Sequence, residues 1–105
     1  MPAQRFEIIY AAQIETHLSF IERKHRTLIR DVIAQQLTHR PEVKTRNRKP
    51  LVQPAAFGAE WEIRFGPDNR FRVLYRVEES QRVRILAIGV KERNCLRVAG
   101  EEIEL

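Results

Sequence analysis

The sequence is poor in cysteine and contains no long apolar run. Its one cysteine, Cys95, cannot form an internal disulfide, which is typical of proteins from a reducing compartment. No stretch approaches the roughly 18 apolar residues that a membrane-spanning helix needs. The N-terminal residues MPAQRFEIIY lack the apolar segment of a secretory signal. We therefore expect a soluble cytoplasmic protein with no membrane partner.

The motifs of common cofactor and metal sites are also missing. The chain has no phosphate-binding loop of the GxxxxGK type, no paired-glycine dinucleotide loop, no CxxC and no HExxH. His17, His25 and His39 are scattered over predicted helices and a loop, and Cys95 has no evident partner base. The sequence therefore predicts neither a metal nor a cofactor.

Positive charge is what the sequence has in excess. The 105 residues include 19 Lys and Arg against 14 Asp and Glu, for a formal net charge of +5. Glu101, Glu102 and Glu104 lie in the last five residues, so the rest of the chain is three units more positive, at +8. This charge favours encounters with polyanions, which indicates nucleic acid or an acidic protein partner.

The N-terminal half predicts a strand followed by two helices. Residues 6–10 are rich in β-branched and aromatic side chains, which is typical of a strand. Apolar side chains then recur at helical spacing in two sets, which are Ala11, Ile14, Leu18 and Ile21, and then Leu28, Ile29, Val32, Ile33 and Leu37. The two sets predict an antiparallel helical hairpin, with Thr27 as the cap of its second helix. Residues 38–54 contain three prolines and predict a long basic connection rather than a regular helix.

The C-terminal half predicts a sheet. Residues 61–65, 70–78 and 82–90 read as strands joined by turns at 66–69 and 79–81, which favours an antiparallel meander. The tail after Lys91 fits either a short helix or strands near 96–98 and 103–105. The whole chain, 1–105, therefore predicts one α+β domain in which an N-terminal strand and a helical hairpin pack on a small antiparallel sheet. We expect the first strand to lie at a sheet edge.

Strand alternation distributes the side chains over two faces of this sheet. We expect the helices to cover an apolar row that includes Ile63, Val73, Tyr75, Ile85 and Ala87. The opposite face should then expose polar side chains around an apolar patch of Leu74, Leu86 and Ile88, and these polar residues are Glu62, Arg64, Arg72, Arg76 and Arg84. Such arginines either pair with glutamate across strands and keep the face soluble, or they bind phosphate.

Four segments, in the order NRKPL, WEIRFG, RFRVLYRV and VRILAIGVKERN, resemble the RelE/ParE superfamily of toxins from bacterial type II toxin–antitoxin modules. The resemblance covers nearly the whole chain, since FEIIYAAQIETHLSFI suits the first strand and helix of that family. It implies a compact α+β toxin. RelE-like members cut messenger RNA in the ribosomal A site, whereas ParE-like members poison DNA gyrase. The resemblance also implies a cognate antitoxin, small and often acidic, that wraps over the basic face in a toxin–antitoxin hetero-oligomer.

The resemblance assigns roles to individual residues. Arg72 matches a phosphate-binding arginine of the RelE-like nucleases, and Arg64 matches a basic residue on the preceding strand. Lys91 and Arg93 match basic positions after the third strand. Two positions depart from the pattern: Glu62 stands where the best-known RelE pattern has lysine, and Arg97 stands where those nucleases have a tyrosine that stacks on the substrate base.

Our leading prediction from the sequence is a metal-independent, ribosome-dependent mRNA endonuclease that inhibits translation. The predicted catalytic groups are Arg64 and Arg72 for charge stabilisation, Glu62 as base, and Lys91 as acid or phosphate clamp. The predicted RNA-binding residues are Lys44, Arg46, Arg48, Lys49, Arg76, Arg93 and Arg97. One alternative is a ParE-like gyrase inhibitor without nuclease activity. Another is an inert member that only binds its antitoxin.

Overall fold

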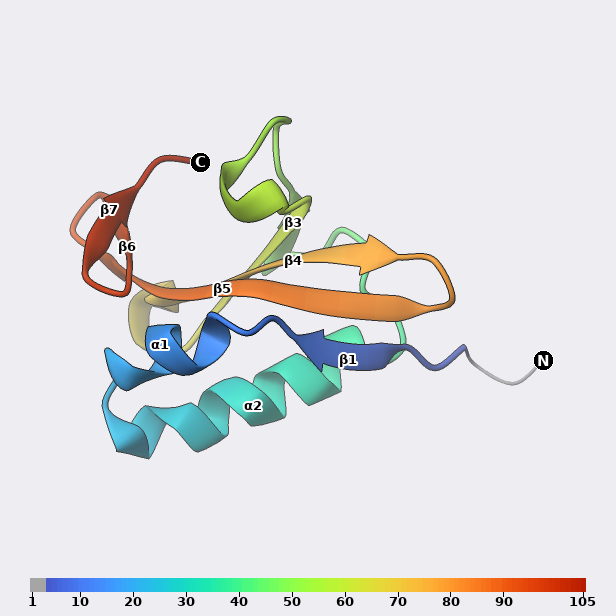
Figure 1. Ribbon diagram of the computed structural model, residues 1–105, viewed down its shortest axis with the longest axis horizontal. Helices are drawn as coiled ribbons and strands as arrows, with labels where there is room; N and C mark the ends of the chain where they lie inside the picture. The colour runs from blue at the N-terminus through green and yellow to red at the C-terminus, as the bar shows by residue number, and fades with distance from the viewer. Residues whose placement is uncertain (1–3) are drawn as a thin grey trace.

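The computed structural model describes residues 4–105, which form one mixed sheet covered by two helices (Figure 1). The α+β prediction is confirmed. The elements, in chain order, are β1 (Glu7–Tyr10), α1 (Ile14–Ser19), α2 (Arg23–Leu37), β2 (Arg48–Pro50), the 3-10 turn η1 (Ala56–Gly58), β3 (Trp61–Phe65), the 3-10 turn η2 (Pro67–Asn69), β4 (Phe71–Glu78), β5 (Arg82–Glu92), β6 (Cys95–Val98) and β7 (Glu101–Ile103).

The sheet is built around the long strand β5. Strands β2 to β7 follow one another in antiparallel order, while β1 pairs with β5 in parallel. One edge of β5 pairs with β4, and the other edge pairs with β1 over residues 82–85 and with β6 over residues 90–92. The predicted edge position of the first strand is therefore confirmed. No helix within residues 4–105 is long and apolar enough to cross a membrane.

Helix α1 covers the gap that β1 and β6 leave along β5. Gln13, just before α1, donates its Nε2 hydrogen to the Leu86 carbonyl oxygen at 3.0 Å, and His17 Nδ1 accepts the Ile88 amide at 3.3 Å. Two side chains thus satisfy backbone groups that would otherwise lack a partner strand. Burial lowers the pKa of His17, which favours the neutral ring that this acceptor role requires.

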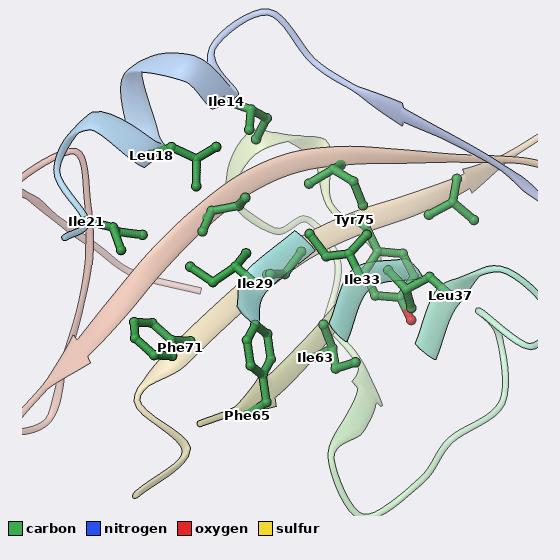
Figure 2. Close-up of a cluster of buried hydrophobic side chains, with 14 residues drawn as sticks. Ile14, Leu18, Ile21, Ile29, Ile33, Leu37, Ile63, Phe65, Phe71 and Tyr75 are labelled. Atoms are coloured by element: carbon green, nitrogen blue, oxygen red, sulfur yellow. The ribbon is translucent and has the colours of Figure 1, made fainter. Parts of the chain in front are cut away.

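The main core lies between the helices and the sheet (Figure 2). Helix α2 presents Ile29, Ile33 and Leu37, spaced four residues apart on one face, and all three are fully buried. They pack with residues of α1 and against the row of Ile63, Val73, Tyr75 and Ile85 on the sheet. Helix α2 begins at Arg23 and is preceded by Glu22, so the prediction that Thr27 caps it was wrong; Thr27 lies inside the helix.

A β-bulge shifts the faces of β5. Leu74 lies opposite Ala87 and Tyr75 lies opposite Ile85, so Leu86 is an extra residue in the ladder. An extra residue reverses the alternation beyond it. Ile88 therefore joins the main core and Ala87 packs on the other face, which corrects the predicted positions of both residues.

The second face of the sheet is covered rather than open. Leu74, Leu86 and Ala87 are buried beneath Ala59, Leu96 and Val98, and Leu51 and Ile103 pack at the margin of this cluster. The predicted exposed apolar patch was therefore wrong. The residues after Lys91 form the β6–β7 hairpin. The prediction of strands in this tail is therefore confirmed, and the alternative prediction of a short helix is wrong.

Candidate functional site

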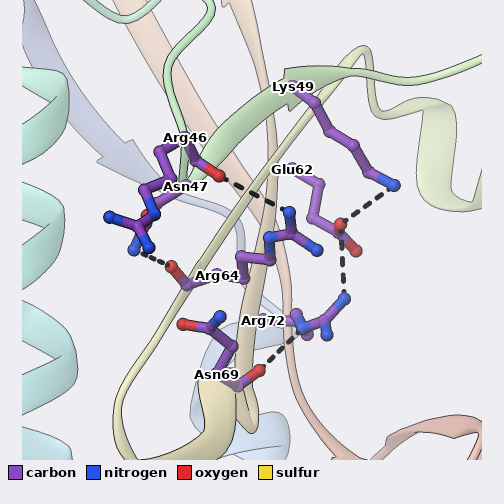
Figure 3. A network of polar contacts seen from close by, with 7 residues as sticks. All are labelled: Arg46, Asn47, Lys49, Glu62, Arg64, Asn69 and Arg72. Carbon is purple, nitrogen blue, oxygen red and sulfur yellow. Dashed lines mark hydrogen bonds and ion pairs between the residues drawn. The ribbon is translucent and has the colours of Figure 1, made fainter.

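Two arginines face each other on neighbouring strands. Arg64 on β3 and Arg72 on β4 are direct cross-strand partners, an arrangement in which like charges repel. Glu62 compensates part of this charge, since its Oε1 lies 3.4 Å from Arg72 Nη1 and 3.8 Å from Lys49 Nζ (Figure 3). Arg72 Nε also donates to the Asn69 carbonyl oxygen at 2.9 Å, so the guanidinium is held in place before any ligand arrives.

A second pair of facing arginines lies at the other end of β4. Arg76 and Arg84 are also cross-strand partners, but Glu78 binds both, at 2.8 Å to Arg76 and 3.0 Å to Arg84. Hydrogen bonds from Arg84, and then from Arg76, lower the pKa of Glu78. Each of the two carboxylates pairs with two cations, Glu78 with Arg76 and Arg84 and Glu62 with Lys49 and Arg72, but within residues 4–105 Arg64 forms no ion pair. The excess positive charge is therefore concentrated at the β3–β4 end.

The structure brings Lys91 to the same place. Arg72 and Lys91 line two hollows of about 450 Å³ each. The first hollow lies between η2 and the β5–β6 turn, and Asp68, Arg70 and Arg93 also line it. The second, which we call the cationic hollow, is lined by Lys49, Glu62, Arg72 and Lys91 and by residues 94–96 and 102–105. The three cations of this hollow lie beside the carboxylates of Glu62, Glu102 and Glu104, so an anionic ligand would have to compete with carboxylates of residues 102–105.

Glu62 is not on an exposed surface as predicted. Its side chain is 1% exposed, and Oε2 has no hydrogen-bond partner among residues 4–105. The reason is strand β2, which the sequence did not reveal: β2 pairs with β3 and places Lys49 directly beside Glu62. Glu62 thus pairs with two cations, and its burial disfavours a role as a base that must contact the substrate.

The comparison with known proteins bears on this whole region. Residues 9–95 match the family model described as the ParE toxin of the type II toxin–antitoxin system, parDE. The chain belongs to this toxin family. No curated protein matches the toxin. The resemblance to the RelE/ParE superfamily is therefore confirmed, and a type II toxin has a cognate antitoxin as its partner.

Arg48 of the toxin has a structural role instead of the predicted RNA-binding one. It is 4% exposed, and its guanidinium donates to the carbonyl oxygens of Gln36, Arg40 and Val43 at 2.5–2.9 Å. A cation at the C-terminal end of α2 also interacts favourably with the helix dipole. Arg48 therefore fastens the basic loop to the helix, and the Tyr75 hydroxyl assists by donating to the Pro41 carbonyl oxygen at 2.6 Å.

The other predicted RNA-binding residues of the toxin are dispersed. Lys44, Arg46 and Arg93 are exposed, and only Arg93 lines one of the two hollows. Arg76 is engaged by Glu78. Arg97 lies 3.7 Å from Glu92 and lines a different hollow beside His17, so it does not join Arg72.

Sequence reasoning missed two contributors to this region. Arg70 lines the first hollow, and its carbonyl oxygen accepts the Lys91 amide at 2.7 Å. Asn69 holds Arg72 through its backbone carbonyl, a role that no side-chain pattern could reveal.

Proposed function

We propose that this toxin inhibits DNA gyrase and does not cleave RNA. The observation that carries the proposal is the burial of Glu62 between Arg72 and Lys49. The predicted cleavage mechanism has Glu62 as its candidate base, and a base must come within hydrogen-bond reach of the proton that it removes. Gyrase poisoning is the activity implied by the ParE-like branch of the superfamily, and the match of residues 9–95 to the ParE model supports it.

In this function the cationic hollow is the anion-binding centre of the toxin. We expect the antitoxin to be small and acidic and to cover the hollow in a hetero-oligomer, because carboxylates complement Arg72, Lys91 and Lys49. The target and the antitoxin are encountered in the cytoplasm, where we place the toxin.

Expression in bacteria without the antitoxin tests the proposal. We expect growth arrest, gyrase-linked DNA breaks and an SOS response, with the 5′ ends of messenger RNAs unchanged. Co-expression of the antitoxin should restore growth. New messenger 5′ ends at ribosome-bound codons, without DNA breaks, would overturn the proposal. Normal growth would instead favour an inert member that only binds its antitoxin.

The second candidate function is ribosome-dependent mRNA cleavage. The facing pair of Arg64 and Arg72, close to Lys91, favours it because guanidinium groups suit the charge of a phosphorane. In this reaction the ribose 2′-oxygen forms a bond to phosphorus as the bond to the 5′-oxygen breaks. In the predicted mechanism the Glu62 carboxylate takes the 2′-hydroxyl proton and Lys91 supplies a proton to the leaving oxygen, and the burial of Glu62 counts against this candidate. Cleaved messages that disappear with Arg72→Gln would support this candidate.

A further inference from the structure

The C-terminal segment of the toxin lies on the cationic hollow. Glu102, Ile103, Glu104 and Leu105 line the hollow that Lys49, Arg72 and Lys91 also line. Figure 1 shows β6, β7 and the C-terminal end together at one end of the sheet. The segment therefore places carboxylates at the hollow that we expect to receive an anionic ligand.

The segment is anchored through its apolar residue. Ile103 pairs with Leu96 across β6–β7 and packs against the second core cluster. The thiol of Cys95 donates to Glu102 Oε1 at 3.0 Å. Glu104 directly follows the last strand and is exposed.

The acidic residues of the segment form no close ion pairs with these cations. Within residues 4–105, the ion pairs of Lys49 and Arg72 are made with Glu62, and none joins Glu102 or Glu104 to a basic side chain. Attraction across an open hollow of about 450 Å³ is long-range and weakened by salt. A ligand with denser negative charge can therefore displace these carboxylates.

We propose that residues 101–105 form an acidic strap that competes with anionic ligands for the cationic hollow. The family match ends at residue 95, so the strap lies outside the matched residues. The proposal requires only that the hollow binds anions, and it holds whichever target the toxin has. Removing the Glu104 charge should strengthen anion binding more than removing the charge of Glu101, which does not line the hollow.

Glu101 provides the matched control. It is exposed and lies on the same strap, but it does not line the hollow. Glu104→Gln and Glu101→Gln raise the net charge equally, so a difference between them reports position rather than total charge. Both changes are at exposed sites, and equal thermal midpoints will show that both variants fold.

The experiment measures binding of a short fluorescent oligothymidylate to the purified toxin by anisotropy at low salt. This DNA probe is polyanionic and lacks the 2′-hydroxyl that RNA cleavage needs. We expect Glu104→Gln to bind it about threefold more tightly than Glu101→Gln, and the difference to shrink as salt is raised. The difference should also vanish in an Arg72→Gln background.

Equal affinities of Glu104→Gln and Glu101→Gln for the oligothymidylate would overturn the proposal that the strap competes with anions. A difference that persists without Arg72 would overturn it as well, because the strap would then act somewhere other than the hollow. Neither result would bear on gyrase inhibition, which is measured separately on DNA topology.

Discussion

Arginine has two opposite roles on neighbouring strands of this toxin. Arg48 is buried and gives its hydrogen bonds to main-chain carbonyl oxygens, while Arg64 is partly exposed and faces Arg72. The sequence places both in the same basic series and cannot separate them. The carbonyl oxygens that accept from Arg48 belong to the end of α2 and to the following loop, and only the folded backbone brings them together.

Arg48→Ala should lower the free energy of unfolding by about 3 kcal/mol or more, because it removes a buried side chain and its hydrogen bonds to three main-chain carbonyl oxygens. Lys44→Ala is the control, since Lys44 is exposed and its loss should cost less than about 0.5 kcal/mol. Urea unfolding followed by circular dichroism measures both. Similar losses for the two variants would show that Arg48 is not the fastening residue.

His17 should make the stability of the toxin depend on pH. Burial lowers its pKa in the folded state, whereas the unfolded side chain titrates near about 6.5. The stabilisation is therefore fully present above about pH 6.5 and is lost as pH falls toward the folded pKa, because the unfolded chain binds the proton more readily.

We expect the urea midpoint of the wild-type toxin to fall between pH 7.5 and pH 5.5, and His17→Gln to reduce this fall. His39→Gln is the control, because His39 is exposed. If the urea midpoint of His17→Gln falls between pH 7.5 and pH 5.5 as much as that of the wild type, the role of the neutral His17 ring is contradicted.

At the scale of elements, alternation and helical spacing predicted the central strands and both helices. Alternation failed at residues 85–88, where four successive apolar residues give no sign of a bulge. Strand β2 has only three residues and ends at a proline, so no periodicity could reveal it. Both omissions affect the site: β2 buries Glu62, and the β6–β7 hairpin brings acidic residues to the hollow. The grouping of Arg64 with Arg72 was predictable because adjacent antiparallel strands set their register.

Gly89 tests how closely β5 and β6 approach. A Cβ atom there would lie 2.6 Å from the Arg97 carbonyl oxygen, which is too close for any real contact. Gly89→Ala should therefore displace β6 and cost about 2–3 kcal/mol. Gly58→Ala is the comparison: its φ of +70° carries strain, about 1–2 kcal/mol, but its Cβ would meet only the end of Arg76. Thermal unfolding that ranks Gly58→Ala as the costlier change would contradict this account.

At the scale of the whole molecule, charge is divided along β4. Glu78 pairs with both arginines at one end; at the other end Glu62 pairs with Arg72 and Lys49, while Arg64 and Lys91 form no ion pair within residues 4–105. This asymmetry makes the Arg72 end the expected functional end of the toxin. Arg76→Gln is then the matched control for Arg72→Gln, since both remove one positive charge from the same strand.

Inhibition of DNA supercoiling by purified gyrase is the most direct test of the proposed function. We predict that the wild-type toxin and Arg76→Gln inhibit supercoiling at similar concentrations, and that Arg72→Gln requires about tenfold more protein, the loss of roughly one charge-assisted contact. Supercoiling that continues unimpaired at toxin concentrations that arrest translation, with messenger RNA cut at the ribosome, would contradict the account.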